Sequence, residues 1–174
     1  MLHLIPNVLS PGHYHVLPAY QQELIRQIQY WYVEDLKQAR RFLKGINRDT
    51  NIDALTFYLL NEHHQEDLQY APALFRKGIP IGLLSDCGCP AVADPGNALV
   101  QIAHREGVRV CPHTGPNAFL LTLMASGFNG QAFQFHGYLP NKQPMLQQKL
   151  LELEAESRRT GASHFFMETP YRNL

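Results

Sequence analysis

Short apolar runs alternate along the chain with segments whose apolar residues recur at helical spacing. The apolar runs, rich in β-branched and aromatic residues, predict strands at 2–5, 30–33, 56–60, 81–84, 108–111, 133–135 and 164–167. The segments between them predict helices at 21–28, 34–44, 65–77, 98–106, 118–126 and 144–158. Glycine directly follows four of these helices, at 45, 78, 107 and 127, and acts as a stop signal.

This alternation predicts an α/β fold in which helices cover both faces of a parallel sheet, giving three layers. Ligands of such sheets bind beyond the carboxyl ends of the strands. The loops that follow the predicted strands therefore share one rim, and we expect a ligand site there. A segment containing Pro140, at 138–143, is the one predicted linker.

Composition narrows the choice of class. Fifteen Lys and Arg balance fifteen Asp and Glu among 174 residues, so the formal charge is zero with the nine histidines neutral. This balance argues against a strongly cationic nucleic-acid module. A hydrophobic fraction of 45% suits a folded core, and no apolar run is long enough for a membrane helix. Three cysteines, an odd number, favour a reducing cytoplasm over a disulfide framework.

Two loops on the predicted rim carry candidate binding residues. The loop at 85–96 holds two glycines and two prolines, and the loop at 113–118 places Asn117 where it could cap the next helix. From residue chemistry alone, each of these loops could be an ordinary turn or a ligand-binding loop. Neither has the spacing of a dinucleotide fingerprint or of a Walker phosphate loop.

The ordered motifs of the chain resemble the tetrapyrrole methylase superfamily of S-adenosylmethionine-dependent methyltransferases. The chain is most similar to the branch that methylates a ribose 2′-hydroxyl of small-subunit ribosomal RNA. The branch's Ser-Asp-Ala-Gly-Thr-Pro…Asp-Pro-Gly run is matched at 85–90 and 94–96, and its Val-Pro-x-x-Gly-Pro-Ser-Ser run at 110–118. Further matches lie at 33–35, 123–127, 135–140 and 166–172.

The resemblance implies a two-domain methyltransferase that holds S-adenosylmethionine in a cleft and tends to form homodimers. Residues 1–140 correspond to the N-terminal α/β domain. Residues 141–174 correspond to a linker helix and the first strand of a C-terminal domain, most of which we expect this chain to lack. The implied cofactor-binding residues are Pro6, Asp86, Gly88, Cys89, Pro90, Val92, Ala93, Gly115, Pro116, Asn117 and Ala118.

Some positions depart from the branch's pattern. The Thr-Arg pair that follows Glu-Asp in the branch is Leu36-Lys37 here, and cysteine replaces Ala and Thr at Cys87 and Cys89. Asn117-Ala118 stands where the branch has Ser-Ser. These changes keep a cofactor crevice but weaken the inference that the substrate is the same RNA.

The catalytic candidates are Glu34 and Asp35, which follow a predicted strand and should lie on the rim. A ribose hydroxyl is a better nucleophile when a base accepts its proton, and a carboxylate there could do so. The alternative is that both residues only favour the start of the next helix. Asp86 has the same two interpretations.

The substrate-binding candidates are Lys37, Arg41, Glu168 and Arg172. Four cations at 37, 40, 41 and 44 share one helix face, which suits an RNA backbone or simply a solvated surface. Glu168 and Arg172 could contact the substrate or form an ion pair. The His and Cys spacings predict no metal site.

Three functions follow in order of preference. The first is a methyltransferase acting on ribosomal RNA. The second keeps the reaction but takes a tetrapyrrole or another small molecule as methyl acceptor. The third is a non-catalytic interaction domain with the cofactor fold.

Overall fold

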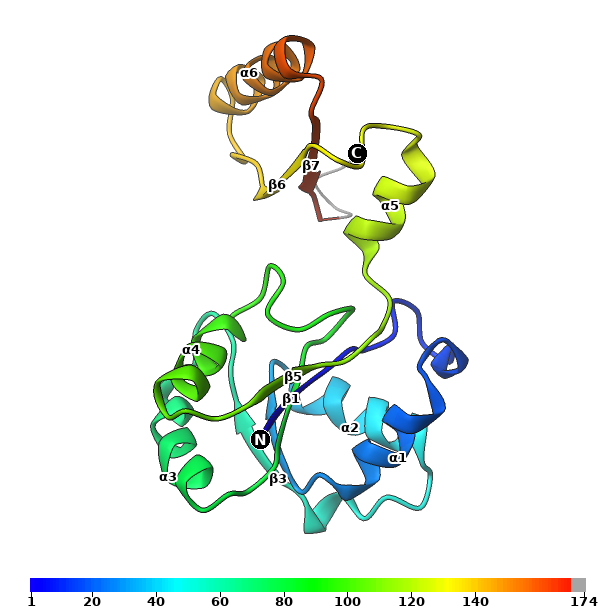
Figure 1. Ribbon diagram of the computed structural model, residues 1–174, viewed down its shortest axis with the longest axis vertical. Coiled ribbons are helices and arrows are strands. Elements are labelled where there is room, and N and C mark those ends of the chain that lie inside the picture. Colours follow the sequence, from blue (N-terminus) through cyan, green and yellow to red (C-terminus); the bar gives the residue numbers. More distant parts are fainter. Residues whose placement is uncertain (170–174) are drawn as a thin grey trace. The chain divides into compact units, whose positions relative to one another are not determined.

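The computed structural model describes residues 1–169, and they form two compact units, one of residues 1–118 and the other beginning at Phe119. In the first unit, a five-stranded parallel sheet has the order β3-β2-β4-β1-β5 (Figure 1). Its strands are β1 (Leu2–Ile5), β2 (Tyr30–Val33), β3 (Thr56–Leu59), β4 (Ile81–Leu84) and β5 (Val110–Pro112). The predicted α/β class is confirmed.

Helices cover both faces of this sheet (Figure 1). They are α1 (Ala19–Gln27), α2 (Leu36–Ile46), α3 (Ala71–Arg76) and α4 (Asn97–Arg105), with 3₁₀ turns η1 (Tyr14–Val16), η2 (Ile52–Ala54) and η3 (Glu66–Tyr70). One core lies under α1 and α2 around the fully buried Trp31, and the other lies under α3 and α4 around Tyr32. Trp31 and Tyr32 are adjacent in β2, so the strand's alternation supplies one large side chain to each core.

Several predicted elements have other bounds in the structure, and three of them show why. Helix α2 begins at Leu36 and not at residue 34, because the Asp35 carboxylate caps it by accepting from Gln38 N–H at 2.8 Å. The helix predicted at 65–77 divides into η3 and α3, and Pro72 occupies the first turn of α3. Strand β5 is displaced to Val110–Pro112, where it pairs with β1.

The second unit contains α5 (Ala118–Ser126) from its second residue on, together with β6 (Phe133–Tyr138), α6 (Met145–Thr160) and β7 (Ser163–Met167). Strands β6 and β7 pair in parallel, with Phe135 opposite Phe165. Phe119 packs against both of these rings, with centroids 5.1 and 5.3 Å away. Because β6 pairs with β7, it lies in this unit, upstream of residue 140. A domain division at residue 140 remains a prediction.

Among residues 1–169, every helix is too short or too polar to cross a membrane.

Candidate functional site

The carboxyl ends of the central strands lie level with one another in the first unit. Ile5 in β1 and Val33 in β2 are both in register with Leu84 in β4. The next residues along the chain, Pro6, Glu34 and Ser85, therefore begin their loops at one edge of the sheet. This is the rim on which the sequence places its candidate residues.

The loop after β1 is bonded to the loop after β4. Asn7 N–H donates to the Gly88 carbonyl at 2.8 Å, and its side-chain Nδ2 donates to the carbonyls of Ser85 and Asp86 at 3.0 Å each. The Ser85 hydroxyl, which is buried, lies 3.3 Å from the carbonyls of Cys87 and Gly88. Gly88 has a φ of +72°, a conformation that favours glycine. These contacts hold the backbone of residues 85–88 in one shape.

The loop at 113–118 lies against the same two loops. The Cys89 thiol donates to the Pro116 carbonyl at 3.5 Å, and Gly115 is so close to Pro6 that a Cβ at Gly115 would overlap the proline ring. The buried Gln21 side chain, which comes from α1, donates to the Thr114 carbonyl. The three loops, each of which carries a predicted cofactor-binding residue, therefore form one continuous surface.

The turn at 90–96 is organised around the Asp94 carboxylate. It accepts hydrogen bonds from Ala91 N–H, at 2.8 and 2.9 Å to its two oxygens, and from Gly96 N–H at 2.8 Å. Ala91 and Ala93 have φ values of 64° and 60°, which non-glycine residues adopt at a cost. Val92 is 45% exposed at the tip of this turn. Asp94 thus holds the turn in shape, a function that its place in the sequence motif did not reveal.

Carboxylates gather at the ends of β2 and β4. Burial and the charges of Asp94 and Asp86 raise the pKa of Glu34 to about 7, although hydrogen bonding from the Asp86 backbone opposes the rise. Burial and the charge of Asp35 likewise raise the pKa of Asp86. Because its pKa lies near neutrality, Glu34 can accept and release a proton under physiological conditions. The structure thus brings Glu34, Asp35, Asp86 and Asp94 together.

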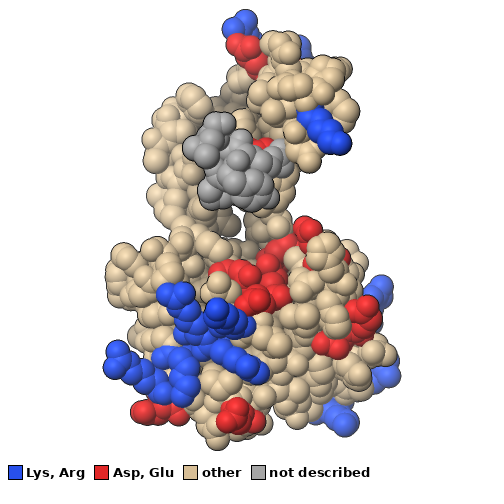
Figure 2. All heavy atoms as spheres, turned by 180° about the vertical axis from the view of Figure 1, so that it is seen from behind, with Lys and Arg blue, Asp and Glu red and all other residues tan. Residues whose placement is uncertain are grey.

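Cations occupy the neighbouring face of α2. Lys37, Arg40, Arg41 and Lys44 are exposed, whereas Ala39, Phe42 and Leu43 of the same helix are buried. Figure 2 shows Lys and Arg gathered beside a group of Asp and Glu on this unit. The rim therefore has an acidic part near β2 and β4 and a basic part along α2.

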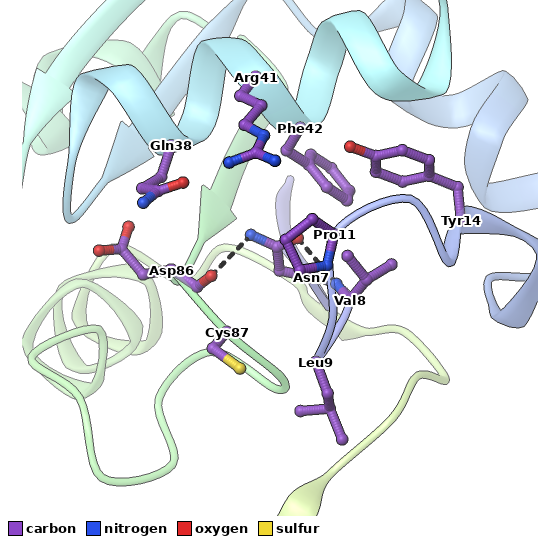
Figure 3. Close-up of a pocket in the computed structure, with 10 residues that line it drawn as sticks. All are labelled: Asn7, Val8, Leu9, Pro11, Tyr14, Gln38, Arg41, Phe42, Asp86 and Cys87. Atoms are coloured by element: carbon purple, nitrogen blue, oxygen red, sulfur yellow. Dashed lines mark hydrogen bonds between the residues drawn. The ribbon is translucent and has the colours of Figure 1, made fainter. Parts of the chain in front are cut away.

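A pocket of about 260 Å³ lies between α2 and the loops after β1 and β4 (Figure 3). Its lining residues are Asn7, Val8, Leu9, Pro11, Tyr14, Gln38, Arg41, Phe42, Asp86 and Cys87. Sequence reasoning had named Arg41 and Asp86 as site residues, and it missed the pocket between them. The spacing of 38, 41 and 42 on one helix face was the available signal.

The remaining candidates lie elsewhere. Glu168 follows β7 in the second unit, and Arg172 lies outside the described residues. Substrate binding by these two residues therefore stays a prediction, as does the alternative of an ion pair between them. Within the described part of the chain, no three His, Cys, Asp or Glu side chains are grouped as metal ligands. His3 in β1 and His113, which directly follows β5, are hydrogen-bonded at 3.1 Å, and burial lowers the pKa of both rings.

The chain is similar to proteins named ribosomal RNA small subunit methyltransferase I. It is 36% identical to the one from Vibrio cholerae over 140 residues, 80% of this chain and 46% of that protein. It is 35% identical to the one from Halalkalibacterium halodurans over 141 residues, 80% and 45% of the two chains. The similarity to the Micromonospora olivasterospora protein, 29% over 173 residues, spans 98% of this chain and 51% of that one.

No family model matches the chain. The chain spans about half the length of the curated relatives that it matches. The shared name of those relatives agrees with the methyltransferase resemblance of the sequence motifs.

Proposed function

We propose that this chain is the cofactor-binding part of an S-adenosylmethionine-dependent methyltransferase that modifies a ribose 2′-hydroxyl of small-subunit ribosomal RNA. The observation that carries the proposal is the similarity to relatives of that name over 80% or more of this chain. Two of the three bonded loops of the rim coincide with the motif segments at 85–96 and 113–118. In keeping with this function, we also propose a cytoplasmic location and a homodimer.

The residues on the rim fit such a cofactor. The pKa of Glu34 is raised partly because Asp94 and Asp86 add negative charge around it. A sulfonium cation would relieve that repulsion, and carboxylates accept hydrogen bonds from ribose hydroxyls. The loops at 88–93 and 115–118 would hold the cofactor mainly through backbone groups, so cysteine at position 89 is acceptable. When bound, S-adenosylmethionine supplies an electrophilic methyl group.

Glu34 is the proposed general base. Its pKa of about 7 lets it accept the 2′-hydroxyl proton as the oxygen attacks, because a base is most effective when its pKa lies near the working pH. Asp35 has another task in the structure, since its carboxylate caps α2. We therefore assign proton transfer to Glu34 and positioning of α2 to Asp35.

Calorimetric titration of S-adenosylmethionine and S-adenosylhomocysteine into this chain tests cofactor binding. Transfer of a radiolabelled methyl group to small-subunit ribosomal RNA tests the acceptor, with large-subunit RNA as the control. We expect binding of both compounds and label in the small-subunit RNA only. Absence of binding by both compounds would overturn the cofactor assignment for this chain.

A small-molecule acceptor is the second candidate, and the acidic part of the rim favours it. Glu34, Asp35, Asp86 and Asp94 would repel the phosphates of an RNA placed directly over them. Salt separates the two acceptors, because affinity for RNA falls steeply with ionic strength whereas affinity for an uncharged small molecule does not. A flat salt dependence of acceptor binding would favour the small molecule.

A further inference from the structure

The pocket in Figure 3, which we call the α2 pocket, differs from the loop surface in its chemistry. Val8, Leu9 and Pro11 from the loop after β1 form an apolar wall, together with Tyr14 and Phe42. Gln38, Arg41 and Asp86 supply polar groups on the other sides. An apolar wall with a few convergent polar groups is the usual composition of a ligand site.

The polar groups of the α2 pocket come from opposite sides and carry opposite charges. Figure 3 shows the Gln38 and Arg41 side chains extending from α2 toward the loop that carries Asp86. Within residues 1–169, Arg41 has no carboxylate at salt-bridge distance. The guanidinium is therefore available to an anionic group, and the Asp86 carboxylate faces the same space as a hydrogen-bond acceptor.

The size of the pocket restricts what it can hold. Its 260 Å³ lies below the range of about 300–1,000 Å³ that is typical of sites for drug-sized ligands. One heterocyclic base fits such a space, whereas a complete dinucleotide does not. Proteins that recognise single-stranded RNA place unstacked bases against aromatic or apolar side chains and hydrogen-bond their edges.

We propose that the α2 pocket binds one unstacked nucleobase of the RNA substrate. Asp86 accepts a hydrogen bond from the exocyclic amine of that base, and Arg41 contacts the adjoining phosphate. A carboxylate only accepts hydrogen bonds, and at the exocyclic position uracil presents a carbonyl oxygen where cytosine and adenine present an amine. A pocket in which Asp86 meets that position therefore selects a base with an exocyclic amine over uracil. The inference rests on the proposed function, because it takes RNA as the methyl acceptor.

The position of the pocket suits this assignment. Asp86 influences Glu34 electrostatically and lies two residues beyond the end of β4 at Leu84. A base held by Asp86 therefore brings its nucleotide to the rim beside the proposed general base. The cations of α2 continue from Arg41 along the helix, where they can follow the RNA backbone away from the acidic part.

Binding of labelled single-stranded hexamers of cytidine and of uridine to the whole chain tests the proposal. Fluorescence anisotropy at fixed low salt gives the ratio of the two affinities. We expect cytidine to bind about tenfold more tightly than uridine, the lower end of what a good base contact provides. Asp86→Asn should bring the ratio close to one, because an amide can also donate to the uracil O4.

Arg41→Ala and Arg40→Ala form a matched pair on the same helix. Both remove one positive charge, but only Arg41 lines the pocket, and Arg40 lies over the Phe57 ring at 5.8 Å. We expect Arg41→Ala to weaken both hexamers about tenfold and Arg40→Ala to have a clearly smaller effect. Leu9→Trp, which fills the pocket without changing charge, should abolish the base preference. Circular dichroism confirms that each variant is folded.

Three results would overturn the pocket assignment: equal affinities of the unmodified chain for the two hexamers, a preserved preference in Asp86→Asn, or equal losses in the two arginine variants. Calorimetric titration of S-adenosylmethionine into the same samples tests the proposed function separately from the pocket assignment. Cofactor binding without base selectivity would leave the methyltransferase proposal standing and remove the α2 pocket from it. Base selectivity without cofactor binding would support the α2 pocket as a nucleobase site and overturn the cofactor assignment for this chain.

Discussion

The side chain of Asn7 donates a hydrogen bond to the carbonyl of Ser85 at 3.0 Å, joining two loops that are 78 residues apart in the sequence. The same Nδ2 also donates to the Asp86 carbonyl, while Oδ1 accepts from Val8 N–H at 2.8 Å. Asn7 is only 5% exposed, so water cannot replace these bonds. One buried amide thus determines how the first loop meets the residues on which the proposed site depends.

Asn7→Asp keeps the shape of the side chain but turns its donor into an acceptor. At pH 7, a buried carboxylate would face two carbonyl oxygens, and we expect the free energy of unfolding to fall by about 3 kcal/mol. Burial raises the folded-state pKa of the new carboxyl, so its protonated form restores a donor. The loss of stability should therefore shrink as the pH falls, and urea unfolding at several pH values measures it.

Asn51→Asp is the matched control for that change. The Asn51 side chain is exposed and already acts only as an acceptor, from Asp53 N–H at 3.2 Å. A carboxylate can take the same part, so we expect a change within about 0.5 kcal/mol. Similar losses in both variants would contradict the importance of the Asn7 donor.

Ala93→Gly should stabilise the chain. Ala93 has a φ of 60°, which costs a non-glycine residue about 1–2 kcal/mol, whereas the extra chain entropy of glycine costs about 0.5–1 kcal/mol. The net expectation is a gain of about 0.5–1 kcal/mol, seen as a higher melting temperature. Ala73→Gly, at an exposed position in α3, should instead lose about 1 kcal/mol. We therefore expect the two variants to change the free energy of unfolding in opposite directions. A loss of stability in both would argue against strain in the turn.

Gly115→Ala tests the close approach of the second loop to Pro6. The added Cβ would overlap the Pro6 ring, so the loop at 113–118 must move. We expect a loss of about 1–3 kcal/mol in the free energy of unfolding, together with weaker binding of S-adenosylmethionine by calorimetry. Gly130→Ala meets open space and should change neither quantity. Unaltered cofactor binding in Gly115→Ala would remove this loop from the proposed binding surface.

Glu34→Gln should change the pH dependence of stability. The folded-state pKa of about 7 lies above the usual 4.5, so between these pH values the folded chain holds a proton that the unfolded chain has lost. Stability contributed by this group is therefore full below about pH 4.5 and is lost as the pH rises through 7. Allowing for the partial exposure of Glu34, the loss is about 1–2 kcal/mol, and Glu34→Gln should lack it.

The same variant tests catalysis. If Glu34 is the general base, kcat/KM for methyl transfer, whose pH dependence reports the free protein, should rise through about pH 7 in the unmodified protein. Glu34→Gln should lower kcat/KM about 100-fold or more. Glu62→Gln, the loss of an exposed neighbouring carboxylate, is the control and should keep most of the activity. If the pH dependence of methyl transfer were unchanged in Glu34→Gln, another group would have to be the general base.

The alternation of residue types by itself determined the α/β class and the positions of the strands, because period and β-branching are local properties. Runs such as Leu2–Ile5, Tyr30–Val33 and Ile81–Leu84 form strands with the predicted bounds. The period does not fix the first residue of a helix where a side chain caps it, as Asp35 caps α2. The order of residue types also indicated which loops would meet at one rim, since parallel strands end at the same edge.

Only the tertiary structure decided how those loops act on one another. The raised pKa of Glu34 depends on burial and on carboxylates from distant segments, and the α2 pocket depends on packing α2 against the loop after β1. Asn7, Gln21 and Tyr14 looked unremarkable in the sequence because their partners lie up to 93 residues away. Local patterns carry the periodicity of single elements, whereas burial, charge crowding and cavities are properties of segments brought together by the fold.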